Sequence, residues 1–297
     1  HPALKVAIPM SAMVDGWRGD DWFHNGAFRM PSLSYLAWQT SVRGSGDAPV
    51  TGVYDDYDAY LRIGSAADYA KKFGIDKLTY TKKLFEHPAY DSYWQEQALD
   101  KILAKRQLIV PTMHVVGQWD QEDIYGPYAS YTAMEGRDTR NNLNYLAIGP
   151  WRHSGVNYDG SSLGALKFDG DTARQFREKV MQPFLNQYLK DGAPEANTAP
   201  VVAYQTGTNQ WQRLQQWPLA CETCDTKLTP IYLQQGNQLG FAAPAGAADA
   251  AEGAFDEYVA DPAKPVPFVP RPVRLNDADV WKPWLVSDQR GYADRTD

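Results

Sequence analysis

A carboxylate and a histidine follow two successive predicted strands of this sequence. The apolar run 108–116 leads into Asp120, and the apolar run 144–149 leads into His153. The carboxyl ends of parallel strands meet at one edge of a sheet, so we expect these two side chains to lie together. Taken singly, Asp120 could be a plain loop carboxylate and His153 an ordinary surface histidine. Their paired positions instead favour the second and third members of a Ser-Asp-His triad, in which the acid orients the imidazole that removes the serine proton.

The serine of such a triad is missing from the 297 residues. No G-x-S-x-G occurs, Ser45 stands between two glycines in helical sequence, and Ser11 follows a strand without the glycines of a sharp nucleophile turn. The chain starts at His1 without a methionine, and we interpret it as an internal piece of a longer protein whose nucleophile precedes residue 1. We therefore expect the chain to be inactive on its own.

Three further carboxylates follow predicted strands. Asp21 lies in the loop after the run 5–10, and Glu122 and Asp123 follow the run 108–116. Carboxylates brought to one point repel one another unless a cation joins them, and a substrate ammonium offers three donors to three acceptors. These residues are therefore candidates for binding an ammonium group.

Other interpretations of the same acids stay open. A bound Ca²⁺ also collects carboxylates, Asp20-Asp21 could be a solvated loop pair, and Glu122 and Asp123 could be favourable charges in a helix first turn. Pro127 is predicted to open the next helix at its first position, which would leave both acids upstream in the loop. The acidic group 55–58 has no strand-end position, and we interpret it as a solvated face or a helix cap.

The elements around these residues predict an α/β fold. Strand–loop–helix alternation over 5–10, 108–116 and 144–149, followed by an amphipathic helix at 171–190, is typical of a parallel sheet. In the run 108–116 the strand ladder is expected to begin just after Pro111. The stretch 32–106 has helical spacing and no strand pattern, with one apolar face made by Leu33, Leu36 and Ala37 and another by Tyr93, Leu99, Ile102 and Leu103. Short β segments at 201–204, 211–214 and 228–233 predict a second, all-β domain.

Composition narrows the class of protein. Apolar residues make up 43% and charged residues 22%, as in ordinary globular domains. A net charge of −7 argues against a nucleic-acid partner, and no apolar run approaches the eighteen residues of a membrane span. The two cysteines, Cys221 and Cys224, have no further ligands at zinc spacing; they would form a small local disulfide in an exported protein and remain two thiols otherwise.

Several longer motifs extend these features. They are Gly16-Trp17-Arg18-Gly19-Asp20-Asp21-Trp22-Phe23-His24-Asn25-Gly26-Ala27-Phe28, Gly117-Gln118-Trp119-Asp120-Gln121-Glu122-Asp123 and Gly149-Pro150-Trp151-Arg152-His153, with 184–190, 207–211 and 288–290 as further landmarks. Over nearly its whole length the chain resembles the α-amino acid ester hydrolases, which belong to the wider family of cocaine esterase, glutaryl acylase and X-Pro dipeptidyl peptidase.

The resemblance implies a fold and a domain order. The C-terminal half of an α/β-hydrolase domain would comprise 1–28 and 107–191, a helical cap would be inserted at 29–106, and part of a jelly-roll β domain would follow at 199–297. Export to the periplasm or medium and a homo-oligomeric full-length protein are also implied.

The resemblance likewise implies a function. Asp120 and His153 would be the triad members, and Asp21, Glu122 and Asp123 would bind the α-ammonium of a small ester or amide substrate, with side-chain amides of β-lactam antibiotics as one option. The reaction would pass through an acyl-enzyme and would need no cofactor or metal. Which acyl and leaving groups are preferred stays open.

Two kinds of alternative remain. Within the enzymes, the chain could come from an X-Pro dipeptidyl peptidase or from a glutaryl acylase or cocaine esterase-like hydrolase, although the acidic cluster would repel a glutaryl anion. In a different class, it could be a non-catalytic calcium- or sugar-binding β module with an α/β support.

Overall fold

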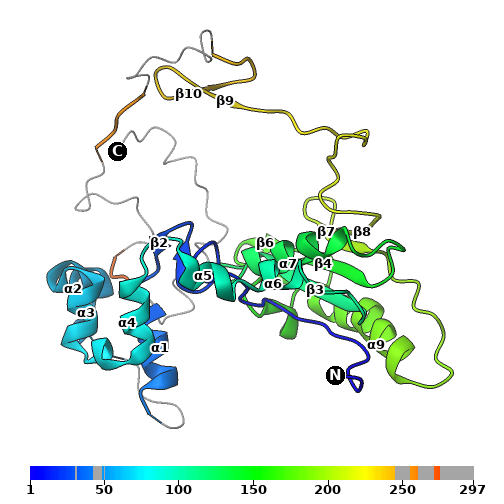
Figure 1. Cartoon of the computed structure of the whole chain (residues 1–297), viewed down its shortest axis with the longest axis horizontal. Coiled ribbons are helices and arrows are strands. Elements are labelled where there is room, and N and C mark those ends of the chain that lie inside the picture. Colours follow the sequence, from blue (N-terminus) through cyan, green and yellow to red (C-terminus); the bar gives the residue numbers. More distant parts are fainter. Residues whose placement is uncertain (31, 43–48, 50, 245–254, 260–270, 275–297) are drawn as a thin grey trace. The chain divides into compact units, whose positions relative to one another are not determined.

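The computed structural model describes residues 1–30, 32–42, 49, 51–244, 255–259 and 271–274. The chain divides into two compact units, one made of 1–215 and 269–287 and the other of 216–268 and 288–297. The first unit holds the mixed α/β part of the chain, and all predicted site residues belong to it (Figure 1).

A four-stranded mixed sheet lies at the centre of the first unit. Its strands run in the order β3 (Thr112–Trp119), β4 (Asn144–Arg152), β7 (Val201–Gln205) and β8 (Gln210–Leu214). β3 pairs with β4 and β4 with β7 in parallel, whereas β8 returns antiparallel to β7. β4 is buried along nearly its whole length, as expected for a parallel strand covered on both faces. β3 begins directly after Pro111, as predicted.

The predicted strand 5–10 is an extended segment beside β3 rather than a full strand. Ala7 and Met10 form isolated parallel bridges to β3, and the Val115 amide donates to the Pro9 carbonyl at 2.9 Å. Pro9 has no N–H to return, so the ladder is interrupted there. The segment nevertheless delivers the chain to the same sheet edge as β3 and β4.

The structure corrects the predicted boundary at residue 199. β7 and β8 belong to the central sheet, and the second unit begins at residue 216. β7 is buried from Val201 to Tyr204 because it pairs with strands on both sides. A short apolar β pattern predicts a strand but does not say which sheet it joins, and that is why the sequence placed both strands in the all-β domain.

The second unit contains little regular structure in its described part. β9 (Tyr232–Gln234) and β10 (Gln238–Gly240) form an antiparallel hairpin, and Cys221 is bonded to Cys224. Residues 245–254, 260–270 and 275–297 of the predicted jelly roll lie outside the described residues. The jelly-roll topology stays a prediction.

Helices cover the two faces of the sheet. The predicted helix at 171–190 is present as α8 (Thr172–Phe176), the π-helical turn η3 (Arg177–Met181) and α9 (Gln182–Leu189), capped at its start by Asp171. Its Phe176 and Phe184 pack in one core cluster with alternate residues of β3 and β4. The helix α7 (Tyr125–Glu135) packs against β3 and β4, and its Tyr131 carbonyl accepts a hydrogen bond from Nδ2 of the Asn144 side chain.

The stretch predicted to be helical is helical. After the small hairpin of β1 (Phe23–His24) and β2 (Ala27–Phe28) come α1 (Ser32–Thr40), α2 (Asp56–Ile63), α3 (Ala66–Lys72), η1 (Ile75–Lys77), α4 (Thr79–Glu86), α5 (Ser92–Gln97) and α6 (Leu99–Leu103). The predicted face of Leu33, Leu36 and Ala37 is buried in one cluster with Trp22 and Phe23. Two short elements, η2 (Gly155–Asn157) and the hairpin of β5 (Ser162–Leu163) and β6 (Leu166–Lys167), follow β4.

The second predicted helical face is wrong at Leu99, whereas Ile102 and Leu103 are half-buried. Leu99 is 45% exposed, whereas Trp94 is buried in the core and Tyr93 packs against the same cluster. Ala98 adopts an extended conformation between α5 and α6, so the two short helices do not share one continuous face.

The acidic group 55–58 serves as a helix cap, one of the two roles expected for it. The Asp55 side chain accepts a hydrogen bond from the Tyr57 amide at the start of α2 and pairs with Arg271 at 2.7 Å. Among the described residues, no helix is long and apolar enough to cross a membrane.

Phe184 should account for a large share of the stability of the helix–sheet core. It is fully buried, and its ring lies 5.0 Å from that of Tyr145 on β4. We expect Phe184→Ala to lower the free energy of unfolding by about 3–5 kcal/mol, because it removes buried apolar area and leaves a cavity. Leu189→Ala on the same helix, where the side chain is 58% exposed, is the control and should cost less than about 1 kcal/mol. Urea unfolding of both variants measures the difference, and equal losses would contradict the assignment of this core.

Candidate active site

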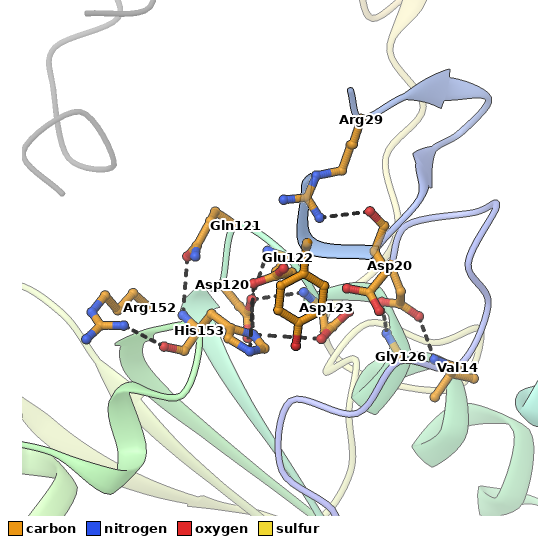
Figure 2. A network of polar contacts seen from close by, with 12 residues as sticks. Val14, Asp20, Arg29, Asp120, Gln121, Glu122, Asp123, Gly126, Arg152 and His153 are labelled. Carbon is orange, nitrogen blue, oxygen red and sulfur yellow. Dashed lines mark hydrogen bonds and ion pairs between the residues drawn. The ribbon is translucent and has the colours of Figure 1, made fainter. Parts of the chain in front are cut away.

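His153 and Asp120 meet at the carboxyl edge of the sheet. The imidazole Nδ1 lies 3.1 Å from Asp120 Oδ1 and 3.2 Å from Oδ2 (Figure 2). The Asp120 side chain is fully buried, whereas that of His153 is 26% exposed. One ring nitrogen is thus held by the carboxylate while the ring keeps an open side. This is the arrangement that the two strand-end positions predict.

A bulge in β4 lies beside the end of β3 that leads to Asp120, because Gly117 pairs with Gly149 but Trp119 pairs with Arg152, which leaves one extra residue in β4. The register between β3 and β4 shifts between Gly117 and Trp119. A side chain at Gly117 would put its Cβ 2.3 Å from the Trp151 carbonyl oxygen, so the two backbones approach more closely than any larger residue allows. Bulges of this kind re-aim the side chains that follow them.

The Asp120 carboxylate also shapes the loop that follows. Its Oδ1 accepts hydrogen bonds from the Glu122 and Asp123 amides, each at 2.9 Å. The helix α7 then begins at Tyr125, so Pro127 lies within the first turn rather than at its first position, contrary to the prediction. Proline is tolerated there because the first amides of a helix have no partner within it. Glu122 and Asp123 therefore lie in the loop, upstream of the helix.

The backbone of His153 is fixed as well. Its amide donates to the Gln121 side chain at 3.3 Å, and its carbonyl accepts from the Arg152 guanidinium at 2.9 Å (Figure 2). The imidazole is therefore positioned by both loops at the sheet edge.

The electrostatics of the pair suit a charged imidazole beside an ionised acid. The hydrogen bond to Asp120 raises the pKa of His153 to about 9, against the opposing effect of burial. Burial would raise the pKa of Asp120, but the hydrogen bond and charge of His153 and the two loop amides lower it overall. Asp120 consequently stays ionised while the imidazole gains and loses its proton.

Glu122 and Asp123 adjoin the same imidazole. Glu122 Oε2 lies 3.8 Å from Nε2, and Asp123 Oδ2 lies 3.8 Å from Nδ1. Asp123 is buried, and its Oδ1 has no hydrogen-bond partner in the described structure. Burial and the negative charges of Asp21 and Asp20 raise the pKa of Asp123 to about 8.

Asp21 faces the same group of charges. Burial and then the charge of Glu122 raise its pKa, while Arg29 and His153 partly offset this rise. Its backbone has a φ of 35°, which is uncommon for a residue other than glycine. The Ser32 hydroxyl at 2.7 Å and the Arg29 guanidinium at 3.2 Å donate to the Asp21 carbonyl and hold it in this conformation.

The structure therefore brings together all five predicted site residues, which are Asp21, Asp120, Glu122, Asp123 and His153. Asp20 has a different environment from Asp21. Asp20 is completely buried and bound to backbone amides, so the solvated-pair interpretation is wrong for it. In the described part of the chain, no group of three or more His, Cys, Asp or Glu side chains is arranged to hold a metal ion.

One neighbour of the site escaped prediction. Partial burial of the phenol and the negative charges of Glu122, Asp21 and Asp123 raise the pKa of Tyr35 on α1. This phenol therefore interacts electrostatically with all three acids. No sequence signal marks Tyr35, because it stands in an ordinary helical pattern, 87 residues before Glu122 and 88 before Asp123.

Comparison with known proteins places the chain among hydrolases. Residues 1–155 match the family model of the X-Pro dipeptidyl-peptidase (S15 family). A solved structure titled α-amino acid ester hydrolase labelled with selenomethionine is 56% identical with a TM-score of 0.90. An aminopeptidase from the marine sediment archaeon Thaumarchaeota archaeon is 46% identical with a TM-score of 0.85.

These matches cover all of this chain but only 48% of each solved chain, so the chain spans about half the length of both. No curated protein matches the sequence. A family model that covers more than half of the 297 residues, together with these two structures, shows that the chain belongs to the X-Pro dipeptidyl-peptidase (S15) family.

Proposed function

We propose that this chain supplies the acid–base half of a serine hydrolase that acts on α-amino acid esters and amides through an acyl-enzyme. The observation that supports it most directly is that Glu122 and Asp123 approach the imidazole that pairs with Asp120, each within 3.8 Å. Membership of the family and likeness to an α-amino acid ester hydrolase agree with this function. The nucleophilic serine would be supplied by sequence outside these 297 residues.

Proton movement in this mechanism centres on His153. Nε2 would accept the proton of the serine hydroxyl as its oxygen attacks the substrate carbonyl carbon. The imidazolium would then give that proton to the departing alcohol or amine as the bond to the acyl carbon breaks. In the second half, a water molecule would lose a proton to Nε2 and attack the acyl-serine, and collapse would return the proton to the serine. Asp120 stays ionised throughout and orients the ring.

The position of the acids defines how far from the scissile carbonyl a bound ammonium group would lie. In an α-amino ester or amide, the nitrogen is two bonds from the carbonyl carbon under attack. A group that binds it must therefore lie beside the catalytic imidazole, as Glu122 and Asp123 do. Burial and then the neighbouring negative charges raise the pKa values of Asp21 and Asp123, and charge-assisted hydrogen bonds from an ammonium would offset both effects.

The alternatives fit this geometry less well. An X-Pro dipeptidyl peptidase must hold an ammonium one residue further from the scissile carbonyl. A glutaryl acylase must hold an anion, which these acids would repel. The likeness to an aminopeptidase is compatible with our proposal, because that reaction cleaves the amide of an α-amino acyl group.

Two parts of the proposal rest on the resemblance alone. We propose that the protein acts outside the cytoplasm, in the periplasm or medium, and that it assembles as a homo-oligomer. Fractionation of the native host and light scattering of the purified protein test these two points separately.

Removal of one charge tests the ammonium site. In the complete enzyme, which is this chain together with the segment that supplies the serine, we expect Asp21→Asn, Glu122→Gln or Asp123→Asn to lower kcat/KM on a phenylglycine ester by about ten- to a hundredfold. The reason is the loss of one charge-assisted hydrogen bond to the ammonium. The matching phenylacetate ester lacks the ammonium and should be far less affected.

The controls decide between binding and structure. Asp159 accepts hydrogen bonds from the Ser161 amide and hydroxyl within its own turn. Asp159→Asn should therefore leave kcat/KM unchanged on both esters. Equal losses of kcat/KM on both esters would mean that the acids are structural. Recovery of the variants' activity on addition of Ca²⁺ would mean that the acids bind a metal ion rather than an ammonium group.

A further inference from the structure

Asp20 links two loops that are distant in the sequence. Its Oδ2 accepts hydrogen bonds from the Val14 amide at 2.8 Å and the Asp15 amide at 2.9 Å, and its Oδ1 accepts one from the Gly126 amide at 3.0 Å (Figure 2). Gly126 lies 106 residues further along the chain. Asp20 is 0% exposed, so water does not compete for these hydrogen bonds.

The two loops that Asp20 joins are those that bring the candidate ammonium-binding acids. Asp21 is its immediate neighbour, and Asp123 lies three residues before Gly126. The packing at this junction is tight, since a Cβ at Gly126 would lie 2.0 Å from the Ala12 carbonyl oxygen. The distance between Asp21 and Asp123 is therefore set by one carboxylate and by the close approach of two backbones.

A carboxylate is chemically required at this position. The helix α7 has 11 residues, and Ile124 before it provides no side-chain hydrogen bond, so the Asp20 oxygen takes over the role of a cap from a distance. An asparagine has a single acceptor oxygen, and its NH₂ group would face either the Gly126 amide or those of Val14 and Asp15. Burial raises the pKa of Asp20 to about 6, although the three amides favour its ionised form.

The catalytic pair is held by other bonds. Asp120 is fixed by the Glu122 and Asp123 amides and by β3, and His153 by Gln121 and β4. Loss of the Asp20 bonds would thus alter the relative position of Asp21 and Asp123 more than the contact between His153 and Asp120.

We propose that Asp20 is a positioning residue for ammonium recognition, which sets the spacing of Asp21 and Asp123 by joining their loops through three backbone hydrogen bonds. This inference rests on the proposed function. It predicts that Asp20 determines selectivity for α-amino substrates although its own carboxylate does not reach the substrate.

The test compares Asp20→Asn with wild type and with Asp138→Asn in the complete enzyme. Asp138 is a matched control, because it too is buried and accepts two backbone amides, those of Leu143 and Asn144 at 2.7 and 2.8 Å. The first readout is the ratio of kcat/KM on a phenylglycine ester to that on the matching phenylacetate ester. We expect Asp20→Asn to lower this ratio by about tenfold or more, mainly through KM on the amino substrate, and Asp138→Asn to leave it unchanged.

Hydrogen exchange provides a readout that does not depend on activity. Peptides covering 12–16 and 124–128 should exchange faster in Asp20→Asn, whereas those of β3 and β4 should stay protected. A folded Asp20→Asn variant with an unchanged ratio, or with unchanged exchange in both loops, would overturn the proposal. If wild type shows no preference for the amino ester, the proposed function fails, and exchange alone then decides whether Asp20 joins the two loops.

Discussion

His153→Ala in the complete enzyme is expected to lower kcat by about 10⁴- to 10⁶-fold, as removal of the base does in other serine hydrolases. The reason is that the variant loses both the acceptor of the serine proton and the donor that protonates the leaving group. KM should change little by comparison, since the acids that would bind the ammonium remain. Single-turnover and steady-state kinetics on a phenylglycine ester measure both quantities.

A second histidine–aspartate pair in the same chain provides the control. His87 Nδ1 lies 2.6 Å from Asp91 Oδ2 between α4 and α5, away from the sheet edge. His87→Ala should therefore retain kcat within about threefold, because it removes a similar pair without touching the proton path. Comparable losses in both variants would show that the His153 effect is structural. Robust activity of His153→Ala would show that another residue is the base.

Asp120→Asn should cost about 10⁴-fold in kcat, comparable to the loss of the orienting acid in other triads. Asp120 Oδ1 accepts the Glu122 and Asp123 amides, and both Oδ1 and Oδ2 lie within hydrogen-bond distance of His153 Nδ1. An asparagine that keeps the two loop bonds with its oxygen therefore places its NH₂ group where Oδ2 was, beside Nδ1. An NH₂ group facing Nδ1 would favour the wrong tautomer and leave Nε2 protonated.

The pH profile of Asp120→Asn adds an independent measure. The imidazole must be neutral to act as a base, so activity is lost as pH falls through the pKa of His153. Asp120 is the largest cause of the raised pKa of His153, and removing its charge should move this acid limb to lower pH. A des-amino ester is the appropriate substrate, because it does not itself titrate in this range.

Asp171→Asn is the matched control for this variant. Asp171 accepts hydrogen bonds from the Gly160 and Arg174 amides at the start of α8, as Asp120 does from its own loop, but contacts no histidine. We expect its kcat and pH profile to match wild type. An Asp120→Asn variant with an unshifted acid limb would contradict the assignment of Asp120 as the orienting acid.

The local pattern of the chain was sufficient to predict the pair of Asp120 and His153. Each follows an apolar strand, and parallel neighbouring strands end at the same edge whatever the rest of the fold does. The adjacency of Glu122 and Asp123 to Asp120 in the sequence likewise required that they approach the imidazole. Helical periodicity at Leu33, Leu36 and Ala37 predicted a buried face for the same local reason.

Predictions failed where a residue's role depends on a distant partner. β7 and β8 look like strands of any β domain, and only pairing with β4 places them in the central sheet.

The sequence by itself determined most of the strands and helices and the residues at the strand ends, because these depend on side-chain periodicity and on neighbours within a few positions. Only the tertiary structure distinguished Asp20 from Asp21, although the two carboxylates are adjacent and chemically identical. Asp20 turns to the amide of Gly126, 106 residues away, and Asp21 turns to the cluster around His153. That choice depends on which backbone donors the folded chain brings to each side chain, and no local pattern contains this information.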